Sequence, residues 1–275
     1  MEIALYIRHI DDSARPYLGT LLETLKQHGI ATREVTDGDS VDGCDFLFTI
    51  GGDGTLLSSV QFVHSSNPAA FPPILGINFG HLGFLTASGK ENAGSIVDDL
   101  LEGRYSLEQR TLLQVESSTL HTTQSAQLAL NEVFLHRSES SSLLRTDVTV
   151  DGDFVASYAG DGVIVATPTG STAYSLSCGG PILTPDSRCL VITPISAHNL
   201  TLRPIIVPDT AVVELSVENA GNYTLGIDSR RTAVEGPIHM TLRRAPFTIS
   251  LVRTGSQSFF SAIRDKLSWG TEAKS

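Results

Sequence analysis

The residues best suited to chemistry form a glycine-rich turn around one carboxylate, Gly51-Gly52-Asp53-Gly54-Thr55. The apolar runs 46–50 and 56–60 flank this turn, which indicates a buried strand before it and a helix after it. Glycine permits positive φ and a close approach of the backbone to a ligand. The free N–H groups at a helix N-terminus bind anions. The stretch therefore predicts a phosphate site formed by Gly51, Gly52, Gly54 and Thr55.

Asp53 is the unusual member of this turn, because its carboxylate repels the anion that its neighbours attract. It therefore needs a role such as holding a hydroxyl group or a metal ion. The alternative is that Asp53 only caps the helix, as aspartate often does. Two glycines before a cap are more than capping requires.

Few cationic side chains are available to neutralise phosphate. The turn is neither a G-x-G-x-x-G fingerprint nor a P-loop, since no lysine follows the glycines. The only lysines in the chain are Lys26, Lys90, Lys266 and Lys274. Phosphate charge would then fall to backbone amides, arginines and a divalent metal, so we expect a nucleotide site that depends on Mg²⁺.

Two polar residues, Asn131 and Glu132, interrupt the strand-like run 128–135. Adjacent side chains of a strand point to opposite faces, so one of the two is expected to face a site. An edge strand would tolerate the same pair.

The segment 161–181 predicts a buried strand, then a loop of proline, glycine and hydroxyl residues, then a helix start. Ser171 or Thr172 is expected to cap that helix, and free amides and hydroxyls there could hold ribose or amide groups of a ligand. An ordinary capped helix would explain the hydroxyl groups, but not so many small residues.

Length, charge and cysteine content limit the class of protein. The 275 residues suggest two domains or one large one, and a 41% apolar fraction is sufficient for packed cores. A formal charge of −11, without a run of Lys or Arg, argues against nucleic acid or an anionic membrane as partner. The three cysteines have no metal-ligand spacing, and no apolar stretch or leader suggests a membrane span or export. We therefore expect a cytoplasmic protein with reduced thiols.

The first hundred residues alternate strand-like and helical patterns. Strands are expected at 3–7, 30–35, 45–50 and 73–77, and one helix carries Leu18, Leu21, Leu22 and Leu25 before Gly29. This pattern predicts an α/β domain with a parallel sheet. The loop 78–85 follows one of these strands, at the end where open α/β sheets bind ligands. A plain strand-to-helix turn would have the same sequence pattern.

The pattern changes after a helix with apolar residues at 96, 97, 100 and 101. From 111 to about 252 the apolar residues fall in short alternating runs, with Asp151-Gly152 as a hairpin signal. These runs predict a β-rich, sandwich-like domain. Residues 257–267 then predict a final amphipathic helix, with Phe259, Phe260, Ile263 and Leu267 on its apolar face.

The motifs taken together resemble those of bacterial NAD kinases over nearly the whole chain. Gly-Gly-Asp-Gly-Thr alone also occurs in diacylglycerol and sphingosine kinases. Its combination with Asn131-Glu132 and the segment 161–181 separates this chain from them, and 193–208 and 259–270 are also similar to segments of that family.

The resemblance implies roles for individual residues. Asp53 would be the catalytic residue and would touch the dinucleotide together with Gly54, while Phe84 packs on a ring. Asn131 and Glu132 would bind ribose and adenine groups, and Asp161 the far end of the dinucleotide. The base and ribose near Asp161 would contact Thr172, Ala173, Tyr174, Ser175, Leu176 and Ser177.

Three positions depart from the family pattern. Asp228 matches a dinucleotide-binding position, but Arg230 stands where Asp-Gly-Gln or Asp-Ser-Gln is usual, and we assign both to NAD binding. Ala159 stands where many relatives have a basic residue, and Phe79 where some have Arg. Arg230 could supply the cation missing at Ala159.

The resemblance also implies an organisation and an assembly. It implies an α/β domain over 1–105 that carries the glycine turn, a β-rich NAD-binding domain over 106–253, and a tail over 254–275 that packs on the α/β domain. Homotetramers or homodimers are expected.

The resemblance therefore implies transfer of a phosphoryl group from ATP, or another phosphate donor, to the 2′-hydroxyl of the adenosine ribose of NAD, giving NADP. One alternative is a lipid kinase with the same turn, but the basic or amphipathic membrane-binding surface that it requires is not found. A second alternative is a non-catalytic NAD-binding sensor, against which the retention of Asp53 counts.

Overall fold

The computed structural model describes residues 1–8, 10–62, 65–79, 83–86, 88–92, 94–117, 127–138, 143–218, 221–255 and 258–269. Residues 80–82 of the expected ligand loop 78–85 lie outside these ranges. The chain forms two compact units, one of Met1–Gln109 with Ile249–Ser275 and one of Arg110–Thr248. The chain passes from one unit to the other within β6 (Tyr105–Ser117) and β17 (Ile238–Thr254).

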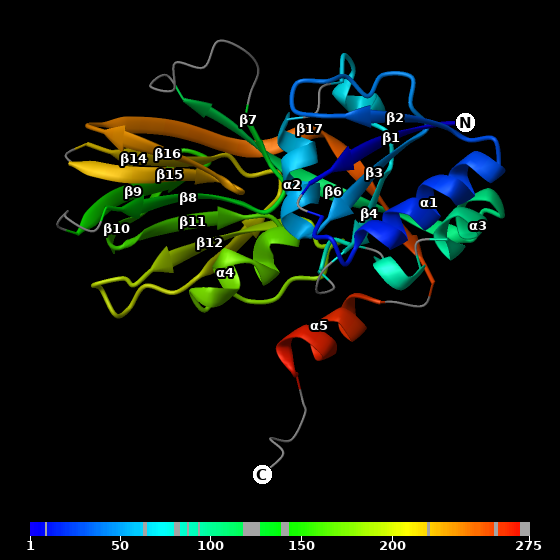
Figure 1. Cartoon of the computed structure of the whole chain (residues 1–275). Helices are drawn as coiled ribbons and strands as arrows, with labels where there is room; N and C mark the ends of the chain where they lie inside the picture. The colour runs from blue at the N-terminus through cyan, green and yellow to red at the C-terminus, as the bar shows by residue number, and fades with distance from the viewer. Residues whose placement is uncertain are drawn as a thin grey trace. The chain divides into compact units, whose positions relative to one another are not determined.

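The first unit is built on a parallel sheet in the order β2-β1-β3-β4, with the end of β17 beside β4 (Figure 1). The short strand β5 also pairs with β4 in parallel. The strands are β1 (Glu2–Ile7), β2 (Ala31–Val35), β3 (Phe46–Gly51), β4 (Ile74–Asn78) and β5 (Ser88–Gly89). Strands β3 and β4 are buried along their whole length, as apolar strands in the middle of a parallel sheet are. The expected α/β fold of this half is confirmed.

Helices complete the first unit. They are α1 (Arg15–Gln27), α2 (Asp53–Phe62), α3 (Ser95–Leu101), α5 (Phe259–Leu267) and the 3₁₀ turns η1 (Pro68–Ala70) and η2 (Lys90–Asn92). Gly29 follows α1 with φ +67°, a conformation that suits glycine after a helix end. The apolar stripe of α1 is narrower than expected, because Leu21 and Leu25 are buried whereas Leu22 is exposed.

The final helix begins with a capping box, in which Ser258 and Ser261 exchange side-chain and backbone hydrogen bonds. Ala262 and Ile263 are buried, whereas Phe260 is 59% exposed. The helix was therefore correctly predicted, but Phe260 does not lie on its buried face.

The second unit consists of β-sheets with antiparallel pairing. One sheet has the order β13-β12-β11-β8-β15-β16, and the other contains β10-β9-β14-β17, with β6 pairing β7 (Figure 1). The strands are β7 (Gln127–Ala129), β8 (Glu132–Arg137), β9 (Leu144–Val150), β10 (Asp153–Gly160), β11 (Gly162–Ala166), β12 (Cys189–Ile195), β13 (Ile205–Pro208), β14 (Val213–Val217), β15 (Asn222–Ile227) and β16 (Arg230–Glu235). Alternate residues of both sheets form one core, which includes Val133, Val163, Leu215, Leu225 and Met240. The predicted β-rich, sandwich-like half is confirmed.

The hairpin between β9 and β10 turns where Asp151-Gly152 predicted it. Both residues have positive φ, +52° and +85°, as a two-residue hairpin turn requires.

The prediction of one strand-like run over 128–135 is wrong at the centre of the run. The chain bends at Leu130 and Asn131, so the run is split into β7 and β8. The backbone groups of the bend find partners outside the ladder, because the Thr167 N–H donates to Asn131 O (2.9 Å) and the Thr167 hydroxyl to Leu130 O (2.6 Å).

The expected capped helix after residue 168 is also wrong. The chain forms a 3₁₀ turn, η3 (Thr169–Thr172), and one helical turn, α4 (Tyr174–Ser177), whose N-cap Ala173 has no side-chain cap. Ser171 instead accepts the Leu183 N–H (2.9 Å) and donates to Pro168 O (2.7 Å). Because its hydroxyl fixes this loop to the segment that follows α4, it is not free to cap a helix.

Candidate active site

The glycine turn lies where β3 ends and α2 begins, as predicted. Gly51 has φ +152°, and a Cβ built on it would lie 2.2 Å from Thr55 Oγ1 and 3.0 Å from Arg8 O. A Cβ on Gly52 or Gly54 would meet nothing within 4 Å, and both residues are exposed. The turn is therefore closed on the Gly51 side and open to a ligand at Gly52 and Gly54.

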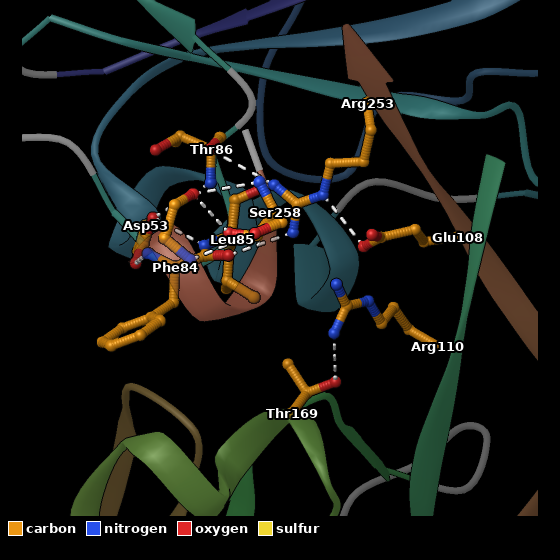
Figure 2. Close-up of polar contacts among 10 residues, drawn as sticks. Asp53, Phe84, Leu85, Thr86, Glu108, Arg110, Thr169, Arg253 and Ser258 are labelled. Atoms are coloured by element: carbon orange, nitrogen blue, oxygen red, sulfur yellow. Dashed lines mark hydrogen bonds and ion pairs between the residues drawn. The ribbon is translucent and has the colours of Figure 1, made fainter. Parts of the chain in front are cut away.

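The Asp53 carboxylate does not cap α2. Its Oδ2 accepts the N–H of Phe84 (2.7 Å), and its Oδ1 accepts those of Leu85 (3.2 Å) and Thr86 (3.2 Å), as Figure 2 shows. These amides belong to another segment, and Gly52 occupies the position before the helix. The helix-cap alternative therefore does not describe this residue.

The segment that holds Asp53 is itself fixed by hydrogen bonds. The Thr86 hydroxyl accepts the Gly83 N–H (3.0 Å) and the Asn78 side-chain amide (3.2 Å). A Cβ on Gly83 would lie 1.5 Å from Asp53 Oδ1, so only glycine lets the segment approach the carboxylate this closely. The Lys266 ammonium of α5 lies 5.2 Å from the centre of the Phe84 ring.

In the second unit, Asp228 holds the bend that carries Asn131 and Glu132. Its carboxylate accepts the N–H groups of Leu130 (2.7 Å), Asn131 (2.8 Å) and Glu132 (3.0 Å). Asp228 is 7% exposed and has φ +50°, which aspartate tolerates better than most residues. Its carboxylate thus shapes the backbone of the bend.

Asn131 and Glu132 carry buried polar atoms that lack a protein partner. Within the described residues, Asn131 Oδ1 and Glu132 Oε2 have no hydrogen-bond partner. A buried polar atom left unpaired costs about 1–3 kcal/mol, and such atoms often mark a functional site. Asn131 and Glu132 therefore each have a buried oxygen that could form a hydrogen bond with a ligand.

Glu132 has an altered acidity. Burial raises its pKa to about 8, and the negative charge of Asp228 adds to this effect, while the Tyr174 N–H opposes it. At neutral pH Glu132 therefore carries a proton and is a hydrogen-bond donor.

The segment 169–177 contributes to the same neighbourhood. A Cβ on Gly170 would lie 2.1 Å from Asn131 O, so the 3₁₀ turn packs directly on the bend. Thr172 donates to Thr169 O (3.3 Å), and Ser175 shares a hydrogen bond with Thr193 (2.8 Å).

Asp161 has a cationic partner that sequence reasoning missed. Arg137 Nε lies 2.5 Å from Asp161 Oδ1, and this hydrogen bond lowers the pKa of Asp161. Arg230 is instead close to Asp228, whose charge opposes the lowering of the Arg230 pKa by burial. Arg137, and not Arg230, thus supplies a cation to Asp161.

The structure thus groups the predicted residues within each unit. The first unit brings together the glycine turn, Asp53 and Phe84. The second brings together Asn131, Glu132, Tyr174, Asp228 and Arg230, with Asp161 on Arg137.

Two further observations concern metals and membranes. Among the described ranges, no group of three His, Cys, Asp or Glu residues could hold a metal ion. The helices of the described part of the chain are all too short or too polar to cross a bilayer.

Comparison with known proteins assigns the family. Residues 8–105 match the family model of the ATP-NAD kinase N-terminal domain, and residues 130–254 match that of the ATP-NAD kinase C-terminal domain. The chain is 35% identical to the NAD kinase of Christiangramia forsetii, over 100% of both chains. It is 39% identical to that of Flavobacterium psychrophilum, over 84% of this chain and 78% of the relative.

Solved structures have the same fold. An NAD kinase from Archaeoglobus fulgidus in complex with ATP aligns with a TM-score of 0.78 and 26% identity, over 98% of this chain and 99% of that one. Yeast NADH kinase complexed with NADH aligns with a TM-score of 0.88 and 23% identity, over 100% of this chain and 89% of that one.

The two domains and their sites thus define a phosphotransferase that acts on a nucleotide. The chain belongs to the ATP-NAD kinase family, and its reaction is the phosphorylation of NAD. Neither the lipid kinase nor the non-catalytic sensor is favoured, since both family domains match.

Proposed function

We propose that this enzyme transfers the γ-phosphoryl group of ATP to the 2′-hydroxyl of the adenosine ribose of NAD, with Asp53 as the catalytic residue. The observation that carries this proposal is the set of three amides on the Asp53 carboxylate. A carboxylate has about four acceptor positions, two on each oxygen. Among the residues that the structure describes, Oδ1 accepts two hydrogen bonds and Oδ2 one, which leaves one position on Oδ2 for a substrate hydroxyl.

The remaining acceptor position suits a residue that orients the hydroxyl group. In phosphoryl transfer the transition state is loose, so that positioning and charge neutralisation contribute more than proton removal. The 2′-oxygen forms a bond to the γ-phosphorus, the bond from that phosphorus to the β,γ-bridging oxygen breaks, and ADP leaves. The hydroxyl proton passes to Asp53 Oδ2 late in this step.

The donor phosphates would bind at Gly51, Gly52, Gly54 and Thr55. The exposed faces of Gly52 and Gly54 and the N-terminus of α2 support this assignment. Mg²⁺, held mainly by the phosphates, would neutralise part of their charge.

The dinucleotide contacts are proposed residue by residue. We assign ribose and adenine contacts to Asn131 and Glu132, whose unpaired oxygens support them, and ring packing to Phe84. The remaining contacts are assigned to Gly54, Asp161, Thr172, Ala173, Tyr174, Ser175, Leu176, Ser177, Asp228 and Arg230.

We also propose the wider setting of the enzyme. It would act in the cytoplasm, as its three unpaired cysteines favour, and as a homotetramer or homodimer. The α/β domain would cover 1–105, the NAD-binding domain 106–253 and the tail 254–275.

The test is NADP formation from NAD, ATP and Mg²⁺ by the purified protein, with NADP detected by an NADP-specific dehydrogenase. A parallel assay with inorganic polyphosphate in place of ATP tests which phosphoryl donor the enzyme accepts. Asp53→Asn should bind NAD but form NADP about 10²–10⁴ times more slowly, because its amide cannot take the proton. Asp39→Asn is the matched control, since Asp39 is an exposed carboxylate of the same unit that accepts the Thr36 N–H (2.8 Å). Near-wild-type turnover of Asp53→Asn would show that Asp53 is not the catalytic residue.

A further inference from the structure

Arg253, near the end of β17, contacts the segment that holds Asp53. Its Nη2 donates to Phe84 O (3.0 Å), and its Nη1 donates to Leu85 O and to Thr86 O (3.3 Å each). Its Nε donates to Glu108 Oε2 at 2.9 Å (Figure 2). The guanidinium thus faces the carbonyl groups of the same three residues whose amides face Asp53.

Two whole peptide groups lie between the two side chains. The peptide that joins Phe84 to Leu85 donates its N–H to Asp53 and accepts from Arg253 through its C=O. The peptide that joins Leu85 to Thr86 does the same. Each peptide dipole therefore points its N–H toward the carboxylate and its C=O toward the cation, an arrangement in which hydrogen bonds strengthen one another.

The guanidinium is well fixed for this purpose. The Arg253 side chain is 16% exposed and the Glu108 side chain 38%, so the ion pair is partly shielded from water. The planar guanidinium presents its donors in a rigid fork, which a lysine ammonium cannot reproduce. Glu108 thus sets the direction from which Arg253 reaches the three carbonyl groups.

We propose that Arg253, oriented by Glu108, is a positioning residue that keeps the Asp53 carboxylate in its reactive orientation through the peptide groups of Phe84, Leu85 and Thr86. This proposal rests on the catalytic role proposed for Asp53. A displacement of about 1 Å at a reacting group can cost on the order of 100-fold in rate. Loss of Arg253 should therefore lower kcat while the KM values for NAD and ATP stay nearly constant.

The experiment compares Arg253→Met, Arg253→Lys and Glu108→Gln with the wild type, measuring kcat, both KM values and thermal unfolding. Arg253→Met should lose about 10- to 100-fold in kcat. Arg253→Lys and Glu108→Gln should show smaller losses, because part of the arrangement is kept. If Arg253→Met does not fold, these two variants carry the comparison.

The matched control is Arg243→Met. Arg243 and Glu116 form another ion pair between the same two strands, β17 and β6, with 3.0 Å between Arg243 Nη2 and Glu116 Oε2, and Arg243 is not part of the proposed machinery. Its kcat should stay at the wild-type value. An equal fall in this variant would assign the effect to the strand pair and overturn the proposal.

A double-substitution cycle separates positioning from general support of the fold. If Arg253 acts through Asp53, then Arg253→Met and Asp53→Asn together should be scarcely slower than Asp53→Asn alone. An equally large additional loss in the double variant would overturn the proposal, as would an unchanged kcat in the single variant. A raised KM for ATP with unchanged kcat would also overturn it and assign Arg253 to phosphate binding. Full turnover by Asp53→Asn would instead refute the catalytic role of Asp53.

Discussion

The carboxylate of Asp228 accepts the backbone N–H of Glu132 at 3.0 Å, so one acidic residue fixes the position of another. Burial raises the pKa of the Glu132 carboxyl to about 8, and the charge of Asp228 adds to that rise. The same carboxylate thus holds the bend through its hydrogen bonds and, through its charge, helps to keep Glu132 protonated at neutral pH.

The free energy of unfolding should therefore decrease as pH rises, because Glu132 loses its proton. Its pKa is raised from the usual 4.5 to about 8, so its contribution is fully present below the lower value and is lost as pH rises to the higher one. Glu132→Gln, which stays neutral, should lose less stability over that range, by at most about 1.4 kcal/mol per pH unit. Urea unfolding of both proteins at several pH values measures this, and parallel curves would contradict it.

Gly83→Ala should reduce turnover without unfolding the protein. The added Cβ would lie 1.5 Å from Asp53 Oδ1, which is the end of a side chain, so the carboxylate moves rather than the backbone. We expect a kcat about 10- to 100-fold lower at nearly unchanged melting temperature. Gly19→Ala in α1 is the control, because nothing lies within 4 Å of its added Cβ. Wild-type kcat in Gly83→Ala would show that the carboxylate position does not limit the rate.

Asp228→Asn should weaken NAD binding and lower the stability of the protein. An amide cannot accept three N–H groups as a carboxylate does, so the bend at Leu130–Glu132 loses part of its support, at a cost of about 1–3 kcal/mol in stability. Isothermal titration with NAD and thermal unfolding measure both effects. Asp151→Asn is the matched control, since Asp151 also has positive φ, +52°, and accepts one backbone N–H, from Val212. Equal NAD affinity in the two variants would show that Asp228 does not support NAD binding.

Turnover should require a divalent cation. The glycine turn has no lysine that could neutralise the donor phosphates, so we expect a divalent cation to do so. Excess chelator should abolish NADP formation, leave NAD binding intact, and be reversed by Mg²⁺. Undiminished turnover in chelator would contradict this expectation.

Local patterns predicted much of the fold because their causes are local. The apolar run of β3, the glycines and the start of α2 are adjacent in the chain, and the Asp151-Gly152 hairpin needs only residues that tolerate positive φ. The break at Asn131 was missed, because the carboxylate that stabilises it comes from Asp228, nearly a hundred residues later.

The residues of the candidate site also differ in whether their signals are local in the sequence. Residues within motifs, such as Asp53, Asn131 and Glu132, could be proposed from the sequence, because each motif is local in the chain. Arg253, Glu108 and Arg137 were not, because each acts through a partner on another strand or segment, and an isolated arginine or glutamate gives no signal of such a contact.

The contact between Arg253 and Leu85 joins residues 168 positions apart. Contacts between distant residues form late, since the entropy of closing the intervening chain must be met first. During synthesis at the ribosome, the residues around Asp53 emerge long before Arg253 does. The support that Arg253 is proposed to give the Asp53 carboxylate can therefore form only after β17 has been made, so a chain that stops before β17 lacks it.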